Sequence, residues 1–190
     1  VGIDAAGGEG AYVGADLKEL EGCQKVVGFC VETWGGVDVL VNVAGAAGGG
    51  DILDLPVELV TDALALQSYG YLRMAQLVIP HLQKNNWGRV VNIGGGAGAS
   101  PGRGIIPTSI ANAMVMNTTR ALSDAVSGDG ILVNVINPGM TNTERARDIH
   151  QPRADKEGRD VEELLKDLGS NLPAGRIAEP EEIARVACFL

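Results

Sequence analysis

Few residues of this chain combine reactive side chains with a spacing that would bring them together. Thr108, Ser109 and Asn112 fall within one turn of a predicted helix, and His150 lies in a strongly charged segment further along the chain. A histidine that activates a hydroxyl would support a hydrolytic or retro-aldol reaction. A single histidine among charged residues is more often simply hydrated, so these residues alone assign no catalytic set.

Composition restricts the possible partners. The 190 residues include 15 basic and 24 acidic side chains, a net charge of −9, so we expect no binding to nucleic acid. No apolar run reaches the ~18–20 residues of a membrane span. Cys23, Cys30 and Cys188 lack CxxC spacing, and neither they nor His81 and His150 predict a metal site. We interpret the cysteines as reduced thiols of a cytoplasmic protein.

Apolar runs alternate with helical patterns, which predicts an α/β fold with a parallel sheet. Short strands are predicted at Val1–Asp4 and Ala11–Asp16, and longer ones at Val37–Val43, Val90–Ile93 and Ile131–Ile136. The run Val37–Val43 shows no alternation of apolar and polar residues. We therefore expect this strand to be buried on both faces.

Four helices are predicted between and after these strands, over Leu17–Trp34, Pro56–Lys84, Pro107–Val126 and from Pro180 onward. Leu20 is expected on the buried face of the first helix. Pro80 should kink or end the second helix. The charged segment Arg145–Ser170 predicts a mobile surface insertion with one amphipathic helix.

The order of the motifs resembles the short-chain dehydrogenase/reductase family. Val37–Gly45 (VDVLVNVAG), Val90–Gly98 (VVNIGGGAG), Pro107–Leu122 (PTSIANAMVMNTTRAL) and Val133–Thr143 (VNVINPGMTNT) follow the family's landmarks in sequence. The resemblance implies one dinucleotide-binding domain over residues 1–190, with a Rossmann-like, doubly wound parallel sheet. It also implies an oxidoreductase that acts on a carbonyl or alcohol.

Two parts of the family pattern are missing from the printed sequence. The family opens with a strand and a TGxxxGIG loop that cradles the cofactor pyrophosphate, and it closes with a further strand. The first strand lies in the middle of the sheet, so its absence would leave backbone groups of its neighbours unpaired. We therefore expect the sequence to be truncated at both ends relative to the natural protein.

The resemblance implies NAD as the cofactor. Asp4, at the end of the first predicted strand, would accept hydrogen bonds from the adenosine ribose and repel a 2′-phosphate, which favours NAD over NADP. Asp16 and Leu17 match the family's pair beside the adenine ring. The alternatives are a hydrated strand-end carboxylate at Asp4 and a helix N-cap at Asp16.

Two further motifs would contact the cofactor. One resembles the family's NNAG motif, with Val43 in place of the second asparagine, and the other resembles its nicotinamide-side PGxxxT element. A plain turn that ends the strand is the alternative for the second motif. The residues implied are Asn42, Ala44, Gly45, Pro138, Gly139 and Thr143.

The family's proton relay is absent at the matching positions. Its serine falls on Gly95, its tyrosine on Thr108, its lysine on Asn112 and its asparagine on Gln67. In the family, the tyrosine donates the proton and the lysine lowers the pKa of that phenol. Here glycine has no donor, threonine is far less acidic than a phenol, and asparagine has no charge.

Three functions remain open on the sequence alone. The first is an oxidoreductase with a substitute donor, such as a water held by Asn112 and Thr108. The second is a hydrolase or lyase on the same fold, and the third is a catalytically silent dinucleotide-binding or partner subunit. No substrate is predicted. The helices Pro56–Lys84 and Thr108–Val126 match those of the family's dimer contact, so we expect a homodimer or homotetramer.

Overall fold

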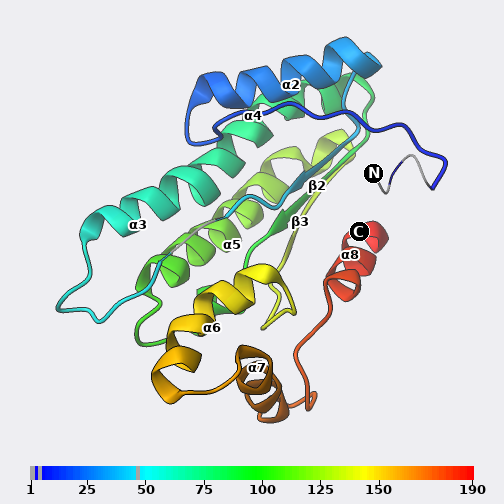
Figure 1. Cartoon of the computed structure of the whole chain (residues 1–190). Helices are drawn as coiled ribbons and strands as arrows, with labels where there is room; N and C mark the ends of the chain where they lie inside the picture. Colours follow the sequence, from blue (N-terminus) through cyan, green and yellow to red (C-terminus); the bar gives the residue numbers. More distant parts are fainter. Residues whose placement is uncertain (1–2, 4–5, 46–47) are drawn as a thin grey trace.

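The computed structural model describes residue 3, residues 6–45 and residues 48–190 (Figure 1). Its three strands, β1 (Val39–Asn42), β2 (Gly88–Ile93) and β3 (Ile131–Ile136), form a parallel sheet in the order β1-β2-β3. This arrangement confirms the α/β class and the three longer predicted strands. The short strand predicted at Val1–Asp4 lies outside the described residues, apart from Ile3.

Three helices cover one face of the sheet. They are α2 (Leu20–Trp34), α4 (Gly70–Lys84) and α5 (Ile106–Val126), close to the predicted ranges. Cys23, Val78 and Val126 of these helices pack in one cluster with Leu40 and Val90 of the strands. Leu20 was expected in this cluster, but its side chain is 44% exposed. It is the first residue of α2, before the helix meets the sheet.

The opposite face of the sheet is much less covered. Val39 and Val41 of β1 alternate with buried neighbours and are 49% and 46% exposed. The prediction that this strand is buried on both faces is therefore wrong. The helix α8 (Pro180–Phe189) borders this face and stands apart from the other helices in Figure 1. Between α8 and the strands lies an apolar groove of about 460 Å³, lined by Val41, Ile183 and Ala187 among others.

The predicted strand Ala11–Asp16 is also wrong, because this segment has no regular structure. It runs past α2, where Nζ of Lys25 donates a hydrogen bond to the carbonyl oxygen of Gly14 at 2.8 Å. The Tyr12 side chain is 95% exposed. A strand needs a neighbouring strand to pair its backbone groups, and none of the described strands lies beside this segment.

The predicted helix Pro56–Lys84 consists of three consecutive parts. α3 (Val57–Ala63) leads into a π-helical turn, η1 (Leu64–Tyr69), which continues as α4. Pro80 does not end the helix, which runs on to Lys84. A π-helical turn inserted in a helix is frequent at functional sites. Here it carries Gln67, one of the relay positions.

The charged segment after β3 contains two helices where one was predicted. α6 (Glu144–Glu157) begins at the N-cap Thr143, and α7 (Val161–Ser170) begins at the N-cap Asp160. Only Ala146 and Ala154 of α6 are buried. Such small apolar residues give a weak helical pattern in the sequence, which is why α6 was missed.

Two short 3-10 turns flank the second and third strands. The 3-10 turn η2 (Gly96–Gly98) follows β2, and η3 (Ser127–Asp129) precedes β3. A reciprocal pair of hydrogen bonds between Glu179 and Glu182 caps α8. None of the helices in the described part of the chain is both long enough and apolar enough to cross a membrane.

Candidate active site

A pocket of about 580 Å³ opens at the carboxyl ends of the three strands. Parallel strands bring these ends to one edge of the sheet, where α/β proteins bind their ligands. All four relay positions, Gln67, Gly95, Thr108 and Asn112, line this pocket. The four positions matched from the motifs therefore lie together at one pocket, and none of them was assigned a catalytic role.

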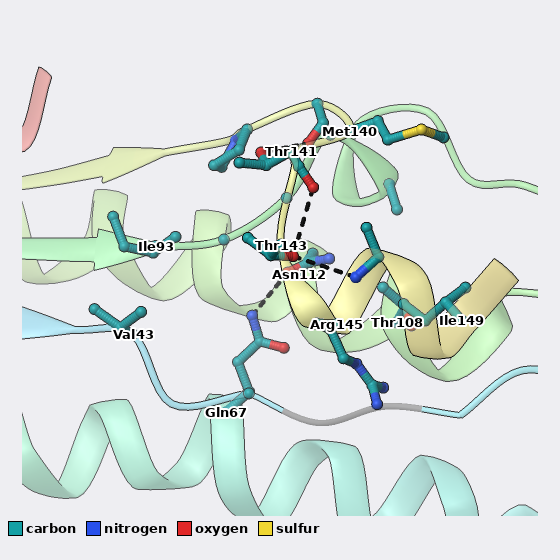
Figure 2. Close-up of a pocket in the computed structure, with 18 of the residues that line it drawn as sticks. Val43, Gln67, Ile93, Thr108, Asn112, Met140, Thr141, Thr143, Arg145 and Ile149 are labelled. Atoms are coloured by element: carbon teal, nitrogen blue, oxygen red, sulfur yellow. Dashed lines mark hydrogen bonds between the residues drawn. The ribbon is translucent and has the colours of Figure 1, made fainter. Parts of the chain in front are cut away.

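Gln67 and Asn112 form a buried pair of amides at the base of the pocket (Figure 2). Nε2 of Gln67 donates to Oδ1 of Asn112 at 2.8 Å, and the residues are 8% and 4% exposed. The π-helical turn η1 carries Gln67, and α5 carries Asn112. Because Oδ1 of Asn112 accepts this bond, its Nδ2 group remains as a donor on the other side of the amide.

The Nδ2 group of Asn112 lies beside Gly95. A β-carbon built on Gly95 would lie 2.8 Å from Nδ2 of Asn112. The amide thus occupies the space into which a serine side chain at Gly95 would extend. Every buried side-chain nitrogen or oxygen among the described residues has a hydrogen-bond partner, and no such partner is recorded for Nδ2 of Asn112. This atom therefore has access to the pocket.

The hydroxyls near Asn112 differ in their access to the pocket. Thr108 is half-buried and lines it. Ser109 is 7% exposed, and its hydroxyl donates to the carbonyl oxygen of Ile105 at 2.9 Å, away from the lining. A hydrolytic arrangement built on Ser109 is therefore not assembled here.

No phenol or ammonium group replaces the missing relay. Among the described residues that line the pocket there is neither a tyrosine nor a lysine. Tyr71, on α4, is 5% exposed and donates to the carbonyl oxygen of Ile93 at 3.1 Å. Burial raises the pKa of this phenol, so it stays neutral and is a poor source of a transferable proton.

Four residues predicted from the two cofactor motifs line the pocket. They are Pro138, Gly139 and Thr143 of the PGxxxT element and Gly45 of the NNAG-like motif. Around Gly139, no atom lies within 4 Å of the position that a β-carbon would take. A flat ring could therefore approach this backbone closely, which fits a nicotinamide.

Asn42 lies below the pocket floor and does not line it. Its Nδ2 donates to Oδ1 of Asn92 at 2.8 Å, and Nδ2 of Asn92 donates to the hydroxyl of Thr119 at 2.9 Å. This buried network joins β1, β2 and α5. Asn42 thus orients the strand end on which the half-buried Ala44 follows.

The adenine-side predictions lie away from the pocket. Asp16 is exposed, and its Oδ1 accepts a hydrogen bond from the backbone N–H of Lys18 at 2.9 Å. Leu17 packs against the hydrophobic core. Neither residue lines the pocket. Asp4, on which the preference for NAD depends, lies outside the described residues.

The helix α6 supplies a wall that the motifs did not reveal. Arg145, Ile149 and His150 line the pocket from this helix. Partial burial lowers the pKa of His150, and the nearby guanidinium of Arg153 lowers it further. His150 is therefore mainly neutral at pH 7. These residues come directly after the PGxxxT element, a position that could have indicated a pocket wall, but this segment was predicted to be a surface insertion.

Comparisons with known proteins agree with the geometry. The family model described as enoyl-(acyl carrier protein) reductase matches residues 3–190. Oxidoreductase UcpA of Salmonella typhimurium is 30% identical over an alignment 194 positions long, which covers 98% of this chain and 72% of that protein. The 3-oxoacyl-[acyl-carrier-protein] reductase FabG of Vibrio cholerae is 26% identical over 187 residues, with coverages of 98% and 72%.

A solved structure shows the same arrangement in three dimensions. Actinorhodin polyketide ketoreductase, a variant determined with NADPH, superimposes with a TM-score of 0.92 at 30% identity. The match covers 98% of this chain and 72% of that one. The strand-end pocket, the spacing of its four relay positions and these similarities lead to one conclusion: the chain belongs to the short-chain dehydrogenase/reductase family.

Proposed function

We propose that the protein is a nicotinamide-dependent oxidoreductase that reduces a carbonyl group to an alcohol, or runs the reverse reaction. The observation that supports this most is the pocket at the strand ends, which combines a nicotinamide-side wall at Gly139 and Thr143 with hydrogen-bond donors at Asn112 and Thr108. The oxidoreductases among the similar proteins support the same class.

The cofactor we propose is NADP(H). The similar ketoreductase was determined with NADPH, which favours NADP(H) over the NAD predicted from Asp4. When bound, the cofactor supplies or accepts the hydride. Pro138, Gly139 and Thr143 would hold its nicotinamide half, because they line the pocket and the backbone at Gly139 is accessible.

The amide of Asn112 would take over part of the missing relay. Its Nδ2 can donate a hydrogen bond to the carbonyl oxygen, which polarises the carbonyl and stabilises the negative charge that develops as the carbon gains hydride. The oxygen then takes a proton from water beside the Thr108 hydroxyl, which completes the alcohol. An amide cannot itself give up a proton, so we expect turnover ~10²–10⁴ below that of a site with a general acid.

The experiment has two parts. Titration with NADPH and NADH, followed by cofactor fluorescence, measures binding and preference. A panel of ketones and aldehydes then tests turnover by loss of NADPH absorbance. Binding of NADPH with slow, Asn112-dependent turnover supports the proposal. Absence of nicotinamide binding would reject it, and tight binding with no turnover of any carbonyl would favour a silent binding protein.

We further propose that the protein assembles as a homodimer or homotetramer through α3–α4 and α5. Tyr69, at the end of η1 between α3 and α4, and Ile110 of α5 are 43% and 42% exposed, which gives this side of the protein an apolar surface to cover. Light scattering after gel filtration measures the mass. The three cysteines are free, which supports a cytoplasmic location, and cell fractionation tests it.

A further inference from the structure

The π-helical turn η1 is the element that brings Gln67 to Asn112. It carries Gln67 and the neighbouring Ser68, and both side chains are buried. Oγ of Ser68 donates to the carbonyl oxygen of Ala111 at 3.2 Å, next to the bond between Gln67 and Asn112. Two adjacent hydrogen bonds thus join this turn to α5, and both depend on the direction in which the side chains of η1 point.

That direction depends on the π-helical register of the turn. A π-helical turn holds one residue more than an α-helical turn, and one residue corresponds to a rotation of about 100° around the helix axis. In an α-helical register, Gln67 would therefore point away from α5 if α4 kept its place. π-Helices are rare and occur mostly as single turns, so contacts outside the turn must help to maintain this one.

Lys18 contacts the helix on both sides of η1. Before the turn, its Nζ donates to Oδ1 of Asp62, in α3, at 3.4 Å. After the turn, its carbonyl oxygen accepts a hydrogen bond from the guanidinium of Arg73, in the first turn of α4. A single residue therefore bridges the π-helical turn from outside.

Gly70 allows the chain before α2 to approach the end of η1 closely. It is the first residue of α4, and a β-carbon built on it would lie 3.0 Å from the carbonyl oxygen of Leu17. The same carbonyl oxygen lies 3.6 Å from Sγ of Cys23, which is fully buried in α2. The residues before α2 are thus held between that helix and the end of the turn.

We propose that Arg73 is a positioning residue for the pair of amides. Its bond to Lys18 holds the chain before α2 against the start of α4, which maintains the register in which Gln67 meets α5. The ion pair of Lys18 with Asp62 is exposed and contributes little, whereas Arg73 is a half-buried, charged donor. The consequence for turnover rests on the proposed function, because it requires Asn112 to act on the substrate.

The test follows the side-chain amide protons of Gln67 by NMR of the isotope-labelled protein, without substrate or cofactor. In Arg73→Met, their exchange with water should become about five- to tenfold faster, the effect of one lost hydrogen bond, while the backbone amides of β2 exchange as before. Arg73→Lys can still donate to a carbonyl oxygen and should restore most of the protection. Arg89, also half-buried, donates to the carbonyl oxygen of Gly88 at 2.9 Å, so Arg89→Met is the matched control.

A second variant tests the same contact without changing Arg73. In Gly70→Ala, the new β-carbon presses against the carbonyl oxygen of Leu17 and should also speed exchange at Gln67. Gly28→Ala, within α2, is its control, because a β-carbon there would meet no atom within 4 Å. If Arg73→Met does not fold, this pair of variants decides.

Unchanged exchange at Gln67 in either Arg73→Met or Gly70→Ala would overturn the inference. Equal acceleration at Gln67 and in β2 would also overturn it, since it would show a general loss of stability, and so would an equal effect of Arg89→Met. Turnover of ketones with NADPH is measured separately, and Arg73→Met should cause no further loss of kcat in the Gln67→Leu background. A parent protein without turnover would reject the proposed function, while exchange at Gln67 would still decide the role of Arg73.

Discussion

Gly95 and Asn112 are sterically coupled: the space for a side chain at Gly95 is filled by the amide nitrogen of Asn112, 2.8 Å from where a β-carbon would lie. The backbone of Gly95 is extended, with φ −171° and ψ 151°, a conformation that any residue can adopt. A side chain at position 95 is therefore disfavoured by its contact with Asn112, and not by backbone strain. A side chain at position 95 and the amide of Asn112 therefore compete for the same space in the site.

The first prediction concerns that contact. Gly95→Ser should lower the free energy of unfolding by ~1–3 kcal/mol, because Asn112 must move and weaken its bond to Gln67. Gly96→Ser is the control, since a β-carbon there would lie 3.6 Å from the carbonyl oxygen of Pro138, an ordinary contact. Urea denaturation measures both. Equal stability of the two variants would contradict the coupling.

The second prediction concerns the pair of amides. Gln67→Leu leaves Oδ1 of Asn112 buried without its donor, so we expect a loss of about 1–3 kcal/mol in the free energy of unfolding. Gln83→Leu removes a comparable bond to Asp129 at the surface and should cost less than about 0.5 kcal/mol. A double-mutant cycle with Asn112→Ala should return a coupling energy between Gln67 and Asn112. Additive effects would show that the bond contributes nothing to stability.

The third prediction concerns the relay. Thr108→Tyr combined with Asn112→Lys restores a phenol and an ammonium group one helical turn apart on α5. Turnover of a ketone that the parent protein reduces slowly should rise by ~10² or more, because a general acid becomes available. Thr108→Phe with Asn112→Lys is the control, which has the ring without its hydroxyl. If both double variants turn over alike, the phenol does not donate the proton.

The fourth prediction concerns pH and α8. Hydrogen bonds from Arg176 and from the backbone N–H of Glu179 lower the pKa of Glu182 from 4.5 to about 2. A carboxyl whose pKa is lower in the folded state stabilises the fold above the unfolded pKa, and the effect disappears as pH falls from 4.5 towards 2. Glu182→Gln should therefore lower the melting temperature at pH 6 and make little difference near pH 2.

The neighbouring Glu181, in the same first turn of α8 but outside the capping pair, provides the control. Differential scanning fluorimetry of the parent, Glu182→Gln and Glu181→Gln from pH 2 to pH 7 gives the comparison. A constant difference between the parent and Glu182→Gln across this range would show that the carboxylate charge plays no part.

The sequence alone determined the types of most elements and the place of the site. The strands around Val90–Ile93 and Ile131–Ile136 and the helix ending at Val126 follow from apolar patterns within a few residues, which depend only on local periodicity. The intervals between Gly95, Thr108 and Asn112 can also be read from the sequence alone. They pointed to the residues that line the pocket and to the absence of the family's serine, tyrosine and lysine at these positions.

The tertiary structure decided what those residues do. The burial of β1 depends on which elements cover the sheet, so the run Val37–Val43 could not reveal that one of its faces is open. The bond between Gln67 and Asn112 spans 45 positions and depends on the π-helical turn η1. The place of Arg145 on the pocket wall follows from the packing of α6. A pattern of neighbouring residues does not encode contacts that form only when distant elements pack together.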